Sequence, residues 1–128
     1  MLTAGYRTFF GLGPQPSQLL NPQVESIVVP ASTNALYVNF NMDMSAELLD
    51  LDPSDFTMLK NGVPFSPFTM TNLSWPTLRQ ARYSFLPPLS CISTDVFSFQ
   101  VNEIIVEWEN AEHGRYVQPS GPFTYIIP

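Results

Sequence analysis

Apolar and polar residues alternate with a period of two along most of the chain after residue 22, and this pattern predicts a series of short β-strands. The clearest strand covers residues 35–41, where Leu36, Val38 and Phe40 share one face. The same pattern predicts further strands over residues 24–29, 56–60, 63–65, 68–73, 81–85, 97–101, 104–108 and 123–127. Many short strands separated by turn residues favour an antiparallel sandwich over a barrel or an α/β fold.

Local signals refine this pattern at several places. Strict alternation in the first strand puts Val24 and Ile27 on opposite faces. Residues 45–49 have the composition of a single helical turn, and residues 52–55 (Asp-Pro-Ser-Asp) carry a helix-start signal. Asn61-Gly62 predicts a two-residue hairpin turn, because both central residues of that turn need positive φ. Loops are expected at residues 86–89 and 109–121.

The first 22 residues break the alternation. They are apolar, but three glycines and three prolines oppose a helix or a long strand, and Arg7 is their one charge. Such a segment has no core of its own and lacks the charge of a self-solvating disordered tail. We therefore predict an extended apolar arm over residues 1–22 and a β-sandwich over residues 23–128. The arm residues expected to bind a partner are Tyr6, Phe9, Phe10, Leu12, Leu19 and Leu20.

Energetics favour a second polypeptide as the place where the arm becomes ordered. Full burial of its large apolar side chains contributes about 10–20 kcal/mol in all, whereas fixing some twenty residues costs roughly 20–40 kcal/mol of backbone entropy. Pairing of the arm backbone with an exposed sheet edge would supply the difference. At about 3.3 Å per residue the arm spans roughly 70 Å, enough to reach a neighbouring subunit. A fold-back of the arm onto its own sandwich is the open alternative.

The charge of the chain excludes two classes of partner. Its net charge is −6 and its pI is near 4.4, with five scattered basic residues, which opposes binding to nucleic acid or to an anionic membrane. No stretch approaches the roughly 20 apolar residues of a membrane span. The start of the chain lacks the pattern of a signal peptide, so we expect synthesis in the cytoplasm. Cys91 is the single cysteine and its role is open.

Few residues suggest reactive chemistry. His113, the one histidine, lies in a polar loop as a candidate ligand-binding residue, and no nucleophile motif accompanies it, so we expect a solvated side chain and no catalysis. One histidine and Cys91 cannot complete a zinc site, and no cofactor is predicted. Asp50, Asp52 and Asp55 could bind Ca²⁺, but helix capping by Asp52 accounts for this spacing better.

The two tryptophans have different expected roles. Trp108 lies on a predicted strand between two glutamates, which favours burial of its ring. Trp75 precedes Pro76 in a predicted loop, where an exposed ring could stack on a sugar. Trp75 is therefore the second candidate ligand-binding residue.

Three segments resemble a known family. Residues 36–45 (Leu-Tyr-Val-Asn-Phe-Asn-Met-Asp-Met-Ser) resemble the Val-x-Phe-Ser-x-x-Met-Asp strand of bacterial Ig-like surface-layer modules. Residues 83–99 and 109–126 are similar to that family's Pro-x-x-Leu segment with its aromatic strand and to its closing loop and strand, although the order of Asn110 and Gly114 departs from the family pattern. The resemblance covers about residues 23–127. It implies an Ig-like antiparallel β-sandwich of about seven to eight strands that serves as a spacer or adhesion unit without catalytic residues.

Ig-like modules of this type also occur on the virions of tailed phages. The leading hypothesis is therefore a non-enzymatic structural protein, a capsid-decoration or tail-associated virion subunit present in many copies. In this hypothesis the arm binds other virion or lattice subunits. The alternative is an adhesion or carbohydrate-binding module on a bacterial cell surface, acting through Trp75 and the loop at 109–121.

Overall fold

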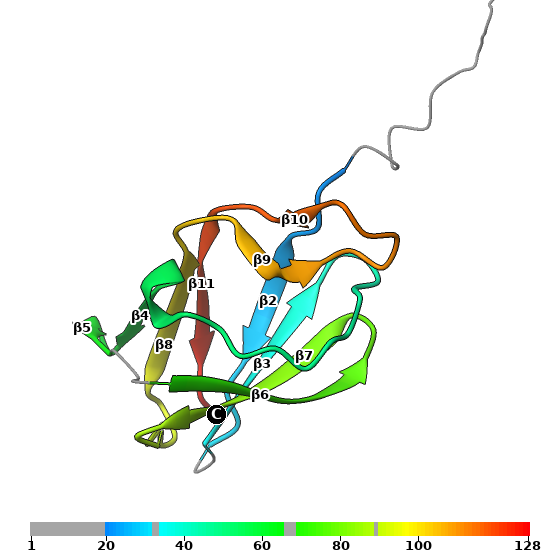
Figure 1. The fold of residues 1–128 in the computed structure, drawn as a ribbon. Coiled ribbons are helices and arrows are strands. Elements are labelled where there is room, and N and C mark those ends of the chain that lie inside the picture. The colour runs from blue at the N-terminus through cyan, green and yellow to red at the C-terminus, as the bar shows by residue number, and fades with distance from the viewer. Residues whose placement is uncertain (1–19, 32–33, 66–68, 89) are drawn as a thin grey trace, which may run out of the picture.

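The structure, a computed structural model, describes residues 20–31, 34–65, 69–88 and 90–128. Two four-stranded antiparallel sheets enclose one core, and a two-stranded ribbon lies at one end of the sandwich (Figure 1). The first sheet has the order β2-β3-β7-β6, with β2 Val24–Val28, β3 Ala35–Phe40, β7 Gln80–Leu86 and β6 Thr69–Thr77. The second has the order β11-β8-β4-β5, with β11 Ser120–Ile126, β8 Val96–Val101, β4 Phe56–Lys60 and β5 Val63–Pro64. The ribbon pairs β9 Ile105–Glu109 with β10 Tyr116–Val117. The predicted fold class, an antiparallel β-sandwich, is confirmed.

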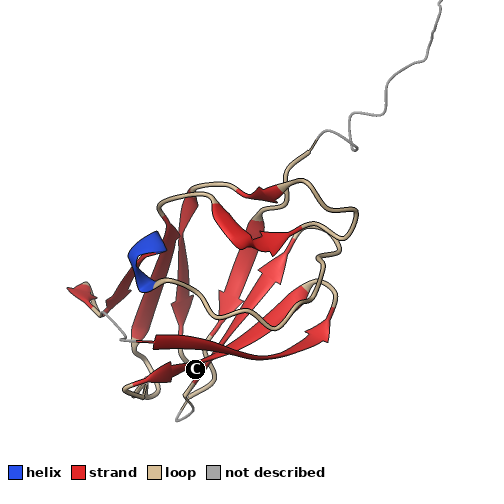
Figure 2. Cartoon of the chain, in the orientation of Figure 1, coloured by secondary structure: helices blue, strands red, loops and turns tan. Residues whose placement is uncertain are grey.

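Strands dominate the described residues, as Figure 2 shows, and the helix among them is the single 3₁₀ turn η2 (Pro53–Asp55). Within that part of the chain, no helix has the length and apolarity needed to cross a membrane. The turn begins as the sequence predicts. Asp52 is its N-cap and accepts a 3.0 Å hydrogen bond from the Ser54 backbone N–H, and Pro53 follows directly.

Trp108 lies at the centre of the core. Its side chain is fully buried, and its indole N–H donates a 2.6 Å hydrogen bond to the Tyr83 hydroxyl. Rings from both sheets surround it, with Phe40 in an edge-on arrangement at 4.9 Å and Phe56 at 6.0 Å between ring centroids. A buried hydrogen-bonded indole satisfies its one polar group, so this aromatic cluster joins the two sheets without leaving an unpaired donor. The expected burial of Trp108 is confirmed.

Alternation correctly predicts the inward faces of the central strands. In β3 the residues Leu36, Val38 and Phe40 are buried, and β7 and β8 bury every second residue in the same way. The predicted hairpin joins β4 and β5, where Asn61 and Gly62 have φ of 54° and 79°.

Three local predictions are wrong. The first strand contains a bulge between Val24 and Ser26, so Val24 and Ile27 both face the core. Residues 45–49 form no helical turn, because the Ser45 N–H donates to the Glu109 carbonyl and the Leu49 N–H to the Asn72 side chain, while Ala46 has a positive φ of 58°. The loop at 109–121 contains β10 and the start of β11.

We call residues 43–52 the strap. They cross from the ribbon to the first sheet, with an isolated bridge from Met44 to Asn110 at one end and from Leu51 to Met70 at the other. Figure 1 shows this segment passing in front of the core between β9 and β6. The strap thereby connects two sheet edges that share no strand.

The outer face of the first sheet carries a ladder of polar side chains across three strands. The Asn39 amide N–H donates a 3.1 Å hydrogen bond to the Ser26 hydroxyl, and the Gln80 amide N–H donates a 2.9 Å hydrogen bond to the Asn39 side-chain oxygen. These residues lie beside one another in register on β2, β3 and β7. This face is polar where the opposite face of the same strands is apolar.

The two ends of the described chain lie at opposite ends of the sandwich. Residue 20 leads into β2 beside the ribbon, and residue 128 follows β11 at the far end, where Figure 1 marks the C-terminus. β2 and β11 lie next to one another across the gap between the two sheets.

Candidate functional site

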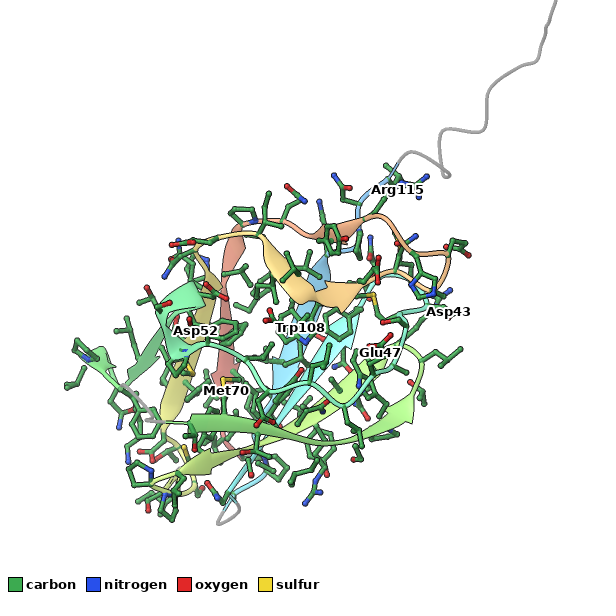
Figure 3. All side chains as sticks on the ribbon, viewed as in Figure 1. Asp43, Glu47, Asp52, Met70, Trp108 and Arg115 are labelled. Carbon is green, nitrogen blue, oxygen red and sulfur yellow. The ribbon has the colours of Figure 1, made fainter. Side chains whose placement is uncertain are left out.

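A cleft opens at the end of the sandwich where residue 20 enters the fold. Its volume is about 680 Å³. Its walls come from the residues after β3, the turn between β6 and β7, and the loop between β9 and β10. The lining residues are Leu20, Asn41, Met42, Asp43, Arg79, Glu112 and Arg115. Figure 3 shows Asp43 and Arg115 at this end of the molecule.

Opposite charges line this cleft. The Arg79 guanidinium donates a 2.9 Å hydrogen bond to the Asp43 carboxylate, and both side chains are more than half exposed. An exposed ion pair of this kind contributes little to stability, since water competes for both partners. Arg115 and Glu112 stand on another wall. The cleft therefore presents polar groups of both signs together with the apolar surface of Met42.

Asn110 shapes the loop wall of the cleft. It is fully buried, and its side-chain oxygen accepts a 3.0 Å hydrogen bond from the Arg115 backbone N–H while its amide N–H donates a 3.1 Å bond to Glu112. The backbone of the loop adds a bond from the His113 N–H to the Asn110 carbonyl. The alternating pattern does not predict this role. An asparagine directly after an apolar strand is the local signal that could have indicated it.

His113 is exposed in the same loop, as the sequence predicts, but its ring has a partner. Its Nδ1 lies 3.0 Å from a Glu109 carboxylate oxygen, and the other oxygen of that carboxylate accepts a 2.7 Å bond from the Gly114 N–H. The hydrogen bond that Glu109 accepts from the His113 ring raises the pKa of His113, and this bond, together with the bond from the Gly114 N–H, lowers the pKa of Glu109. This pair holds the loop in its turn, in which His113 has φ of 69°.

Trp75 is not in a loop. It lies on β6, which continues through Pro76 to Thr77 because β6 is an edge strand whose register shifts there. The ring packs on Phe40 at 5.6 Å, and the indole N–H donates a 2.8 Å hydrogen bond to the Glu47 carbonyl of the strap. One face of the ring and its polar group are thus used within the domain. Ligand binding by Trp75 stays a prediction.

Asn72 fastens the strap to β6. Its side chain is 7% exposed, and its oxygen accepts hydrogen bonds from the Leu49 backbone N–H (3.2 Å) and from the Trp75 indole (3.1 Å). Its amide N–H donates to the carbonyls of Ser74 (3.2 Å) and Arg82 (3.1 Å). One buried amide therefore uses both its donor and its acceptor groups. Asn72 is not among the predicted site residues, although it occupies an inward position of the alternating pattern.

The acidic residues of the strap region serve structural roles. Asp50 accepts a 3.1 Å bond from the Asn72 backbone N–H, and Asp52 caps η2, with the Ser54 N–H lowering the pKa of its carboxyl. Burial, followed by the charge of Asp52, raises the pKa of Asp55. Among the residues that the structure describes, no three His, Cys, Asp or Glu side chains are grouped as metal ligands would be. Capping accounts for the spacing of Asp52 and Asp55.

Cys91 is buried beneath the loop that precedes β8. Burial raises the pKa of its thiol, although the charge of Lys60 acts in the opposite direction. A buried thiol with a raised pKa is a poor nucleophile. Of the predicted partner-binding residues, Leu20 is described; it is 55% exposed and lines the cleft. The others, Tyr6, Phe9, Phe10, Leu12 and Leu19, lie outside the described residues.

Comparison with known proteins identifies the fold. No family model matches the sequence, and no curated protein matches it. Solved structures do match, among them the N-terminal part of the bacterial S-layer protein SbsC, at 16% identity and a TM-score of 0.53 over 88% of this chain and 25% of that one. This chain shares its fold with part of SbsC.

Two longer structures of SbsC agree. Domains 1–6 of SbsC match at 15% identity with a TM-score of 0.55, and a crystal structure of residues 31–844 matches at 13% identity with a TM-score of 0.53. Each match covers 88% of this chain but 14% of the SbsC chain. The chain therefore spans about one seventh of the length of each of these two SbsC structures.

Proposed function

We propose that this chain is a non-enzymatic structural module of a multi-copy protein assembly on a bacterial cell surface. The observation that carries the proposal is the fold that it shares with part of SbsC, a bacterial surface-layer protein. The resemblance of residues 36–45 to surface-layer modules supports the same conclusion from the sequence. A virion subunit of the same design is the other setting predicted from the sequence, and the fold comparison favours the cell surface over it.

The contacts of the candidate site residues support a structural role. His113 is paired with Glu109, the Trp75 indole is bonded to the strap, and Asp52 caps a helical turn. Each of these groups stabilises the conformation of a loop or a strap.

The arm provides the attachment to neighbouring subunits in this proposal. Residues 1–22 carry large apolar side chains with Arg7 as their one charge, and Leu20 enters the fold at the cleft. An arm of this length reaches roughly 70 Å when extended. That distance exceeds the roughly 30 Å diameter of a domain of this size, so the arm can reach a second copy.

The test is the mass of the full chain in solution. Light scattering after size exclusion should show association that increases from micromolar to sub-millimolar concentration. The double variant Phe9→Ser/Phe10→Ser should be monomeric throughout, and the control Gln15→Ser/Gln18→Ser, in the same arm, should associate like the unmodified chain. A chain that stays monomeric at every concentration would contradict self-assembly.

A further inference from the structure

The end of the sandwich opposite the cleft gathers exposed apolar side chains. We call Val63, Leu86, Ile92, Val96 and Ile126 the apolar pole; their side chains are 36–65% exposed. Figure 1 shows β5, the loop before β8 and the C-terminus at this end, away from the exit of residue 20. The pole therefore combines the ends of strands from both sheets.

Hydrogen bonds join the three segments of the apolar pole that carry Val63, Ile92, Val96 and Ile126. The Asn61 backbone N–H donates to the Val96 carbonyl at 2.8 Å, and Lys60 donates to the Ser90 carbonyl at 2.6 Å. The Thr94 N–H donates to the Ile127 carbonyl. The hairpin at 60–65, the loop at 90–95 and the end of β11 are thus fixed relative to one another before any partner binds.

The apolar pole is poor in charge. Across its described segments (28–31, 34–35, 60–65, 86–88, 90–96 and 126–128) the charged side chains are Lys60 and Asp95. These two pair with each other at 4.0 Å, and Asp95 is further used by the Asn61 side chain and the Ile92 backbone N–H. A protein of net charge −6 thus carries almost none of its free charge here. Contiguous apolar surface without charge marks a protein interface.

Three other exposed apolar residues lie beside charged ones. Leu48 and Leu49 of the strap stand between Glu47 and Asp50, and Leu78 precedes Arg79 at the cleft. An apolar segment that covered those residues would also have to desolvate the charges beside them. The apolar pole imposes no such cost.

We propose that the apolar pole receives the apolar arm, residues 1–22, of a second copy of this chain. The inference rests on the proposed function and adds the surface to which the arm binds. The arm matches the pole in chemistry, because it offers large apolar side chains and one charge. It also matches in position: each copy bears its arm at one end and its pole at the other, so successive copies join head to tail. Such a contact is heterologous and produces a filament or a closed ring.

Substitutions on the full chain test this proposal. Leu86→Lys/Ile92→Lys places charge in the pole at two side chains that are each 65% exposed, so the fold should tolerate it. We expect this pole variant to weaken self-association by at least about tenfold. The matched control is Val106→Lys, at a residue of β9 that is 60% exposed and lies outside the pole; it should associate like the unmodified chain.

A mixing experiment separates the possible occupants of the pole. The arm variant Phe9→Ser/Phe10→Ser has an intact pole, and the pole variant has an intact arm. Each alone should be monomeric, while their mixture should form a 1:1 heterodimer that grows no further, since one productive junction remains. The heterodimer supports the proposal.

Other results overturn it in distinguishable ways. If the pole variant assembles as well as the unmodified chain while the arm variant does not, the arm binds elsewhere and the proposed function stands without this surface. If both variants are monomeric and their mixture forms no heterodimer, the arm of a second copy does not occupy the pole. If the pole instead binds the arm of its own chain, the unmodified protein stays monomeric at all concentrations. That last result contradicts the proposed self-assembly as well.

Discussion

Replacement of Asn72 by alanine should destabilise the domain far more than replacement of the half-buried Asn39 on the outer face of the same sheet. The variant removes four side-chain hydrogen bonds: one joins β6 to the strap, one joins β6 to β7, and two lie within β6. A net hydrogen bond contributes about 1 kcal/mol, and a buried group left without a partner costs about 1–3 kcal/mol. The Trp75 indole keeps the Glu47 carbonyl as a partner, so its loss is partial. We expect the free energy of unfolding to fall by about 3 kcal/mol.

Asn39→Ala is the matched control. Asn39 bonds to Ser26 and Gln80 on the outer face, where water replaces the lost partners, so its effect should stay within about 0.5 kcal/mol. Urea denaturation followed by tryptophan fluorescence measures both variants, and Trp75 next to the substituted amide should report the change. If Asn72→Ala cost no more than Asn39→Ala, the strap would not depend on this amide, and our account of how it is held would be refuted.

Three further predictions concern the loops. Glu109 raises the pKa of His113 above 6.5, and its own pKa lies below 4.5, so their pairing stabilises the loop fully between about pH 4.5 and 6.5. The pairing is lost as the pH rises through the folded pKa of His113 or falls through that of Glu109. An NMR titration should show the His113 pKa moving down toward 6.5 in Glu109→Gln, and an unchanged value would contradict the pairing. Gly62→Ala should cost about 1 kcal/mol in urea denaturation, because Gly62 has φ of +79° and no atom crowds the new methyl group; an unchanged free energy of unfolding would argue against strain in the turn. Asp50→Asn/Asp52→Asn should melt at the same temperature with and without Ca²⁺, as should the unmodified chain, and a Ca²⁺-dependent shift lost in the variant would restore the calcium hypothesis.

Alternation and turn chemistry were sufficient to predict the sandwich. Strands such as β3 repeat an apolar residue at every second position, and Asn61-Gly62 carries its own backbone preference, so both signals are local. The bulge in β2 has no comparable signal. It depends on how the strand pairs with β3, and a single shift in register changes which residues face the core.

The site residues depend on contacts between distant parts of the chain. Asn72 bonds to Leu49, 23 residues away, and Asp43 meets Arg79 across 36 positions, so neither contact shows in a local pattern. Pro76 predicts a loop at Trp75, because a proline ends most strands. An edge strand such as β6 tolerates a proline, which has no N–H to donate, because no further strand pairs with the outward side of an edge strand.

The placement of residues 20 and 128 at opposite ends of the sandwich determines how the domain bears mechanical load. Tension applied between them pulls β2 and β11 in opposite directions along their own axes. The hydrogen bonds that join β2 to β3 and β11 to β8 are then strained together in shear, whereas a force across the strands would peel them one at a time. A module connected in this way resists rupture through a slow rate of forced unfolding, even where its equilibrium stability is modest.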